Sequence, residues 1–174
     1  GNLLVTRNCE LRISDFGLAR ERPKDLQTYS PDIPPEGGGM TEHVITRWYR
    51  PPELMLSPNG YYNFSVDVWS IGCIFGELLG RRPLFPGSSF IEQLSLIFDV
   101  IGSPAPSEVE HIRGAQARKF LLEVEGKAHV AFTELLPGTD EDGANLLDLL
   151  LRFDPEKRCT PAQGLLHPFF ASIK

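Results

Sequence analysis

Residues 65–80 read SVDVWSIGCIFGELLG, and this segment restricts the fold more than any other part of the 174-residue chain. Its apolar residues fall on nearly every side of a helix, which is the pattern of a helix that is surrounded by other elements. Ser65 is the expected cap at its start and Gly80 the expected end. The segment therefore predicts a buried helix within a larger helical core.

Four further segments have helical patterns with recognisable ends. Residues 88–102 should form a helix that Ser88 or Ser89 caps and that Gly102 terminates. Residues 106–124 have an intermittent apolar face and predict one or two surface helices, interrupted near Gly114. Two shorter helices are expected in residues 143–153 and 160–170, the second started by the Thr160–Pro161 pair.

The front of the chain has a different pattern. Two short apolar runs, LLV at residues 3–5 and LRIS at 11–14, flank the polar segment TRNCE and predict a small hairpin. Residues 21–39 are rich in Pro, Gly and charge, which predicts a mobile loop. The expected fold is mainly α, with a small β hairpin at the N-terminal end. Because the strand begins almost at residue 1, we expect the chain to be a piece of something longer.

Composition excludes several classes of protein. The formal charge of -6 argues against general nucleic-acid binding, and no apolar run approaches the roughly 20 residues that a membrane span needs. The first residues lack the basic start and long apolar stretch of a signal peptide. Three cysteines, Cys9, Cys73 and Cys159, have no metal-ligand spacing, which favours a reducing compartment. The expected location is cytoplasmic, nuclear or both.

Four short motifs follow one another in a specific order. DFG occupies residues 15–17, with Asn2 thirteen residues before its aspartate, and RPPE, DVWSIG and FDPEKR follow at residues 50–53, 67–72 and 153–158. Together they resemble the C-terminal lobe of a eukaryotic Ser/Thr protein kinase, over residues 1 to about 170. GNLLV resembles the end of the catalytic-loop motif. The resemblance implies a partial protein kinase domain over residues 1–174, with an activation segment at residues 15–53 and no N-terminal lobe.

Within protein kinases, the chain is most similar to the MAP kinases. TEHVITRWYRPPE at residues 41–53 and the helical insert at about residues 103–126 both resemble that family. Cyclin-dependent kinases share the WYRxPE pattern, but they lack a T-x-Y-like pair that is followed by TRWYR.

The resemblance implies ATP and Mg²⁺ as cofactors. Asp15 and Asn2 would be the Mg²⁺ ligands, because a carboxylate and an amide oxygen suit a hard cation that neutralises phosphate charge. Phe16 would pack inward, and Gly17 would allow an unusual backbone angle. The structural alternatives are a turn-forming acid at Asp15 and a polar strand-edge residue at Asn2.

The resemblance also implies a phosphorylation switch. Thr41 would be the phosphorylated residue, and Arg20 would be one of the side chains that bind its phosphate. The alternative is that Thr41 is a loop hydroxyl without a regulatory role.

The chain departs from the T-x-Y pattern at one position, because His43 stands where MAP kinases have the tyrosine. In relatives, Arg47 and Arg50 would hold the phosphotyrosine. In this chain they would either meet Glu42 or hold the loop through backbone contacts.

The resemblance also implies roles for Thr46 and Arg50. Thr46 lies where the family positions its catalytic aspartate by hydrogen bonding. If Arg50 occupies the backbone carbonyl beside the residue after the phosphoacceptor, an ordinary N–H there stays unpaired at a cost of roughly 1–3 kcal/mol. Proline has no N–H and avoids this cost, so the resemblance predicts Ser-Pro or Thr-Pro targets.

Three charged residues are expected to be structural. Glu53 and Arg158 would form a buried ion pair between the end of the activation segment and the late helices. Asp67 lies inside an apolar helix, where it needs a partner. In kinases that partner is the catalytic-loop backbone, and the apolar neighbours of Asp67 argue against a solvated acid.

The sequence leaves two functions open. It contains no glycine-rich loop and no VAIK lysine, and the catalytic-loop aspartate would fall five residues before Asn2. In the first, the chain is a fragment of an active Ser/Thr kinase that acts on protein substrates. Its expected partners are those substrates, an upstream activating kinase and a phosphatase. The second is a non-catalytic module that binds partners through its helical lobe.

Overall fold

The computed structural model describes residues 2–17, 19, 47–56, 64–109, 112, 114–124 and 126–173, and it divides into two compact units. The first unit covers residues 1–33 and the second covers residues 34–174. No helix among the described residues is both long enough and apolar enough to cross a membrane.

The first unit contains the predicted hairpin. Strands β1 (Leu3–Val5) and β2 (Leu11–Ile13) pair antiparallel, with Leu3 opposite Ile13 and Val5 opposite Leu11. The turn between them closes where the N–H of Thr6 donates to the Glu10 carbonyl at 2.9 Å. Cys9 takes a left-handed backbone conformation in this turn, with φ of 61°. The expected mainly helical fold with a two-stranded hairpin at its front is confirmed.

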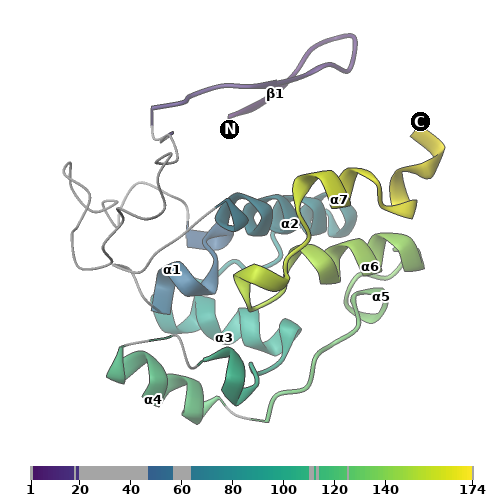
Figure 1. The fold of residues 1–174 in the computed structure, drawn as a ribbon. Helices are drawn as coiled ribbons and strands as arrows, with labels where there is room; N and C mark the ends of the chain where they lie inside the picture. Colours follow the sequence, from purple (N-terminus) through teal and green to yellow (C-terminus); the bar gives the residue numbers. More distant parts are fainter. Residues whose placement is uncertain are drawn as a thin grey trace. The chain divides into compact units, whose positions relative to one another are not determined.

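Helix α2 (Ser65–Gly80) is the predicted buried helix, and α6 (Glu141–Leu150) packs against it (Figure 1). One side of α2 is buried, whereas Ile71 and Leu78 on another side are exposed. The helix is therefore covered over only part of its circumference within this unit. The side chains on its buried side are Val68, Trp69, Gly72, Cys73 and Gly76.

The predicted ends of α2 need two corrections. Phe64, not Ser65, occupies the cap position, and Ser65 is the first residue of the helix. Gly80 is the last helical residue, but the left-handed residue that follows it is Arg81, with φ of 58°.

Three other helix ends depend on side-chain caps. Ser89 accepts a hydrogen bond from the Glu92 N–H and starts α3 (Phe90–Ile101), which ends at Gly102 with φ of 77°. Thr160 and Gln163 form a reciprocal capping box at the start of α7 (Pro161–Leu165). Asp140 caps α6, so this helix begins before residue 143, where the sequence pattern placed its start.

The predicted surface segment contains a short 3₁₀ helix, η2 (Pro106–Glu108), and α4 (Ala115–Glu123), with Gly114 at the cap position between them. The interruption expected near Gly114 is therefore confirmed. The remaining elements are η1 (Arg47–Tyr49), α1 (Pro52–Leu56), α5 (Phe132–Leu135), η3 (Pro155–Lys157) and η4 (Pro168–Ile173).

Aromatic side chains link these helices into one core. The rings of Trp69 and Phe85 stack with their centroids 6.0 Å apart. Phe98 on α3 meets Phe153 at 5.9 Å and Phe120 on α4 at 6.3 Å. Together with the aliphatic side chains packed around them, these rings form one core that extends from α2 to α4.

Gly72 is required where α2 meets α6. A Cβ at this position would lie 2.7 Å from the Leu151 Cδ2 atom and 2.9 Å from its Cγ atom, which is closer than such contacts allow. Gly72→Ala should therefore lower the free energy of unfolding by about 1–3 kcal/mol, as overpacking does. Urea unfolding of the protein measures this change.

Gly164 is the matched control, because it is also helical but its Cβ would meet only the Cys159 Sγ atom at 3.8 Å. Gly164→Ala should leave stability unchanged or raise it by about 0.5–1 kcal/mol, since alanine is the better helix former. Equal losses in the two variants would contradict this account of the α2–α6 contact.

Candidate functional site

The hairpin brings the two predicted metal ligands to the same end of the first unit. The main-chain N–H and the side-chain hydroxyl of Ser14 both donate to the Asn2 carbonyl, at 2.9 and 3.3 Å. Asn2 therefore lies across the ladder from Ser14, and Asp15 is the next residue along the chain. Both Asn2 and Asp15 are exposed.

The turn at residues 15–17 differs from the expected one in two respects. The unusual backbone angle was expected at Gly17, but it falls on Asp15, with φ of 64°. Aspartate tolerates this conformation better than most residues, and here its Oδ1 accepts the Gly17 N–H at 3.2 Å. Phe16, expected to pack inward, is instead 69% exposed.

This end of the hairpin has the donor chemistry that Mg²⁺ requires. Asp15 offers a carboxylate and Asn2 a side-chain amide oxygen, which are both hard oxygen ligands. One oxygen of the Asp15 carboxylate accepts the Gly17 N–H, and this contact fixes the local direction of the side chain. The residues present therefore fit the cation. Among the described residues, no cluster of three or more His, Cys, Asp or Glu side chains could hold a metal by itself.

Several predicted residues lie outside the described part of the chain. These are the phosphorylation site Thr41, its expected partner Arg20, the predicted positioning residue Thr46 and the loop at residues 21–39. Their assignments stay predictions.

Three successive side chains of η1 are hydrogen-bonded to the loop before α3 and to α2. Arg47 donates through Nη1 to the Ser88 carbonyl at 3.1 Å, and Trp48 donates through Nε1 to the Gly87 carbonyl at 3.1 Å. The Tyr49 hydroxyl donates to Glu77 at 2.7 Å. Arg47 therefore has a backbone contact, one of its two alternatives, and the other, a contact with Glu42, lies outside the described residues.

Two further contacts fix η1. The Ser70 hydroxyl donates to the Tyr49 carbonyl at 3.0 Å, and the Arg50 N–H donates to the Arg47 carbonyl at 3.0 Å. Burial, together with the hydrogen bond and negative charge of Glu77, raises the pKa of Tyr49 to about 12. Tyr49 therefore stays a neutral donor through the physiological pH range.

Glu53 and Arg158 form the predicted ion pair, and its geometry is bidentate. Nη1 and Nη2 of Arg158 each lie 2.7 Å from one carboxylate oxygen of Glu53. The side chain of Arg158 is 0% exposed and that of Glu53 is 12% exposed. The same guanidinium also lies over the Trp69 ring, with Cζ 5.0 Å from the centroid.

The carbonyl groups around Arg158 satisfy the rest of its donors. Its side chain donates to the main-chain oxygens of Ser65, Arg152 and Phe153 at 3.0, 2.8 and 3.2 Å. A charge this deeply buried is tolerated only when it is paired and hydrogen-bonded, as this one is.

Asp67 was expected to need a partner rather than to be solvated, and it is exposed in the structure. It lies in the first turn of α2 on an exposed side of the helix, although its neighbours Val68 and Trp69 are buried. Successive helical residues point about 100° apart, so apolar neighbours in sequence do not determine the environment of the residue between them. Nothing in the described residues tests its expected pairing with the catalytic-loop backbone, so that pairing stays a prediction.

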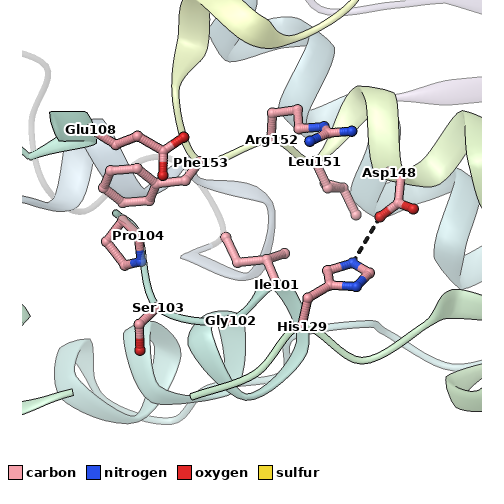
Figure 2. A pocket seen from close by; sticks show the side chains of 10 residues that line it. All are labelled: Ile101, Gly102, Ser103, Pro104, Glu108, His129, Asp148, Leu151, Arg152 and Phe153. Atoms are coloured by element: carbon pink, nitrogen blue, oxygen red, sulfur yellow. Dashed lines mark ion pairs between the residues drawn. The ribbon is translucent and has the colours of Figure 1, made fainter. Parts of the chain in front are cut away.

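A hollow of about 190 Å³ lies between the end of α3 and α6, and its lining among the described residues includes none of the predicted site residues (Figure 2). On one side, His129 Nε2 lies 2.8 Å from the Asp148 carboxylate. On the other side, the Lys157 ammonium lies 2.8 Å from the Glu108 carboxylate. Both acids in its lining are therefore paired within the protein. The lining residues are Ile101, Gly102, Ser103, Pro104, Glu108, His129, Asp148, Leu151, Arg152 and Phe153.

The pKa of Glu108 reflects its contacts with Lys157 and with the Ala105 N–H. Burial raises the pKa of the carboxyl, but the Lys157 hydrogen bond and the Ala105 N–H outweigh it and leave the pKa below its usual value. Glu108 is therefore ionised at neutral pH and held by the protein itself.

Comparison with protein families matches residues 1–170 to the family described as "Protein kinase domain". The chain belongs to this family, and the resemblance to MAP kinases is confirmed by its relatives. It is 44% identical over 172 residues to "Extracellular signal-regulated kinase 1" of Dictyostelium discoideum. The matched region covers 99% of this chain and 30% of that protein.

Two plant proteins are similar to the same extent. "Mitogen-activated protein kinase 7" of Arabidopsis thaliana is 43% identical over 173 residues, covering 99% of this chain and 44% of that protein. "Mitogen-activated protein kinase 2" of the same plant is 41% identical over 173 residues, covering 99% of this chain and 43% of that protein. The chain thus spans less than half the length of each of these relatives.

The Glu53–Arg158 pair predicts a large difference between replacing Glu53, whose partner is fully buried, and replacing Lys157, which is largely exposed. Glu53→Ala leaves the guanidinium buried without its counter-ion and should lower the free energy of unfolding by about 3–5 kcal/mol. Lys157→Ala, which removes a side chain that is 55% exposed, should change it by no more than about 1 kcal/mol. Urea unfolding would contradict the assignment if both variants lost the same stability.

The three free cysteines should react at different rates. Cys9 is exposed, whereas burial raises the pKa of both Cys73 and Cys159 and disfavours their reactive thiolates. A thiol-specific chromogenic reagent should therefore modify one thiol rapidly in the native protein and all three in denaturant. Cys9→Ser should remove the fast phase. A persisting fast phase would show that a buried thiol is accessible.

Proposed function

We propose that this chain is part of an ATP-dependent Ser/Thr protein kinase of MAP kinase type. Membership of the protein kinase family supports the class, and this family generally uses ATP and Mg²⁺. The observation that carries the proposal is the hairpin end, where Asn2 is held across from Ser14 and Asp15 follows directly. In this proposal residues 15–53 form the activation segment, and the helical insert covers about residues 103–126.

Asn2 and Asp15 would hold Mg²⁺ on the phosphates of ATP. The bound cation supplies charge neutralisation as the terminal phosphoryl group is transferred. The left-handed conformation of Asp15 and its contact with the Gly17 N–H orient the carboxylate, so the ligand is held in place before nucleotide arrives. Phe16 and Gly17 complete the nucleotide-side turn in this proposal. The catalytic aspartate, the glycine-rich loop and the lysine would come from other parts of the full-length protein.

The substrates in this proposal are proteins with Ser-Pro or Thr-Pro sites. Arg50 would engage a main-chain carbonyl beside the residue after the phosphoacceptor, so that only proline leaves no unpaired N–H there. Thr46 would position the catalytic aspartate. An upstream kinase and a phosphatase would act on Thr41, whose phosphate Arg20 would bind. The proposed location is cytoplasmic, nuclear or both.

The role of Asp15 is tested in the full-length protein by phosphotransfer from ATP to a Ser-Pro peptide. Asp15→Asn should lower kcat at least about 100-fold, because several kcal/mol of charge stabilisation depend on the carboxylate. Asp142→Asn, at an exposed acid on α6, is the control and should leave kcat unchanged. Equal activity in wild type and Asp15→Asn would refute the metal role. A wild type inactive at every Ser-Pro or Thr-Pro peptide would favour the non-catalytic binding module.

Substrate preference gives a second test in the same assay. Replacing the proline of a Ser-Pro peptide by alanine restores an N–H and should lower kcat/KM roughly 5- to 150-fold, which corresponds to about 1–3 kcal/mol. Arg50→Ala should reduce this preference. The same preference in Arg50→Ala and wild type would remove Arg50 from the explanation.

A further inference from the structure

The hollow between the end of α3 and α6 has one wall that internal hydrogen bonds hold in place (Figure 2). Ser103 at this wall donates its N–H to the Lys127 carbonyl at 2.9 Å and accepts the Lys127 N–H on its Oγ atom at 3.0 Å. Further along the same segment, the Val130 N–H donates to the Val100 carbonyl at 2.9 Å. The chain on both sides of His129 is therefore fastened to α3 and to the residues that follow it.

The backbone at Gly102 shows how closely these two segments approach. Gly102 has φ of 77°, and a Cβ there would lie 2.8 Å from the His129 main-chain nitrogen and 3.0 Å from the Lys127 carbonyl oxygen. Both are main-chain atoms, which cannot move aside as the end of a side chain would. This wall of the hollow is thus preformed, as the sites of small ligands usually are.

The apolar part of the lining is small. Leu151 and Phe153 are buried, and Ile101 and Pro104 are half-buried. The volume of about 190 Å³ is close to that of an engineered apolar cavity of about 150 Å³ that holds benzene. It is below the roughly 300–1,000 Å³ that is usual for pockets of drug-sized ligands. The hollow therefore fits one ring-sized apolar group, and a nucleotide or a long acyl chain is too large for it.

The two acids of the lining already have partners in the protein. Glu108 Oε1 lies 2.8 Å from the Lys157 ammonium, and Glu108 Oε2 accepts the Ala105 N–H at 2.9 Å. Asp148 Oδ1 lies 2.8 Å from His129 Nε2. The hollow therefore does not depend on a bound cation to balance these acids.

Arg152 is the charged side chain of the lining that lacks such a partner among the described residues. Leu151 and Phe153 on either side of it are buried, whereas Arg152 is exposed at the edge of the hollow. Within the described part of the chain its guanidinium makes no hydrogen bond or ion pair, and its charge acts on Glu108 only at longer range. A guanidinium offers five N–H donors in a planar fork that matches a carboxylate. The lining thus combines a place for an anion with a place for an apolar group.

We propose that this hollow binds a small carboxylate that carries a ring-sized apolar group. The Arg152 guanidinium takes the carboxylate through two parallel hydrogen bonds, and the apolar group lies against Ile101, Leu151 and Phe153. The bound molecule also contacts the turn that holds Arg158, because the main-chain oxygens of Arg152 and Phe153 accept from that side chain at 2.8 and 3.2 Å. The described lining includes none of the residues assigned to Mg²⁺, phosphate or substrate, so this binding goes beyond the proposed function.

Three probes of similar shape test the ligand chemistry by isothermal titration calorimetry of the full-length protein. Phenylacetate has an anionic head group, phenylacetamide a neutral one and phenethylamine a cationic one. Phenylacetate should bind at least about tenfold more tightly than phenylacetamide, because hydrogen bonds between charged groups are the stronger ones. Tighter binding of phenethylamine would show that the acids set the chemistry and would overturn the proposal. Failure of phenylacetate to bind saturably at millimolar concentration would overturn it as well.

Variants at Arg152 test the anion contact. Arg152→Gln removes the guanidinium but leaves the main-chain carbonyl that Arg158 needs, and it should lower phenylacetate affinity at least about tenfold. Arg152→Lys keeps the charge but loses the planar fork, so its affinity should be intermediate. Lys119→Gln, at an exposed base on α4, is the matched control and should bind as the wild type does. Equal losses in Lys119→Gln and Arg152→Gln would reduce the effect to net charge and refute the site.

A second measurement locates the probe independently of its affinity. In methyl-labelled full-length protein, phenylacetate should shift the methyl resonances of Ile101 and Leu151, and it should shift them less in Arg152→Gln. The methyl resonances of Leu165, which is 68% exposed on α7 and outside the lining, should stay in place. Shifts confined to methyl groups outside the lining would place the ligand elsewhere and contradict the proposal. Neither measurement requires kinase activity, so failure of the proposed function would leave both outcomes interpretable.

Discussion

The buried guanidinium of Arg158 is the interaction on which the helical unit depends. It meets Glu53 on α1, the first residue of α2, the turn at residues 152–153 and the face of Trp69. Because a buried charge without partners is unfavourable by several kcal/mol, these segments must come together in one arrangement for the charge to be satisfied. The pair thus specifies where α1 joins the other helices, a role that an apolar contact of the same size would fulfil less selectively.

This arrangement gives η1 a rigid base. Glu53 lies three residues after Arg50, so the bidentate pair fixes the chain immediately beyond η1. Before it, Arg47, Trp48 and Tyr49 attach the chain to the loop at Gly87–Ser88 and to α2. Residues 47–53 therefore belong to the helical unit in their contacts, although their sequence reads as part of a loop.

The sequence predicted those features that depend on residues close together along the chain. The caps at Ser89 and Thr160 and the end at Gly102 depend on residues within one helical turn, so spacing alone identified them. The Glu53–Arg158 pair joins residues 105 positions apart, and it was predictable only through the resemblance to kinases. The hairpin followed from two short apolar runs and the polar segment between them, whereas its register did not.

The features that the sequence did not predict depend on the direction of a side chain around a helix or on contacts between distant residues. Asp67 was judged by its sequence neighbours, which point to other sides of the helix, and it is exposed. Asp140 was missed as a cap because the apolar pattern of α6 begins only after its first turn. The unusual angle was assigned to Gly17 because glycine permits it most easily, but the hydrogen bond from Gly17 to Asp15 selects the aspartate. No sequence pattern indicated that Arg47 and Trp48 donate to Gly87 and Ser88.

The separation of 105 residues between Glu53 and Arg158 has a consequence for synthesis on the ribosome. At about 5–20 residues per second, the carboxylate emerges roughly 5–20 s before its partner has been made. During that interval the Glu53 carboxylate has no counter-ion, so the contact that fixes α1 cannot form. The nascent chain therefore passes through a period in which it is incompletely folded and open to aggregation, and synthesis of Arg158 ends that period.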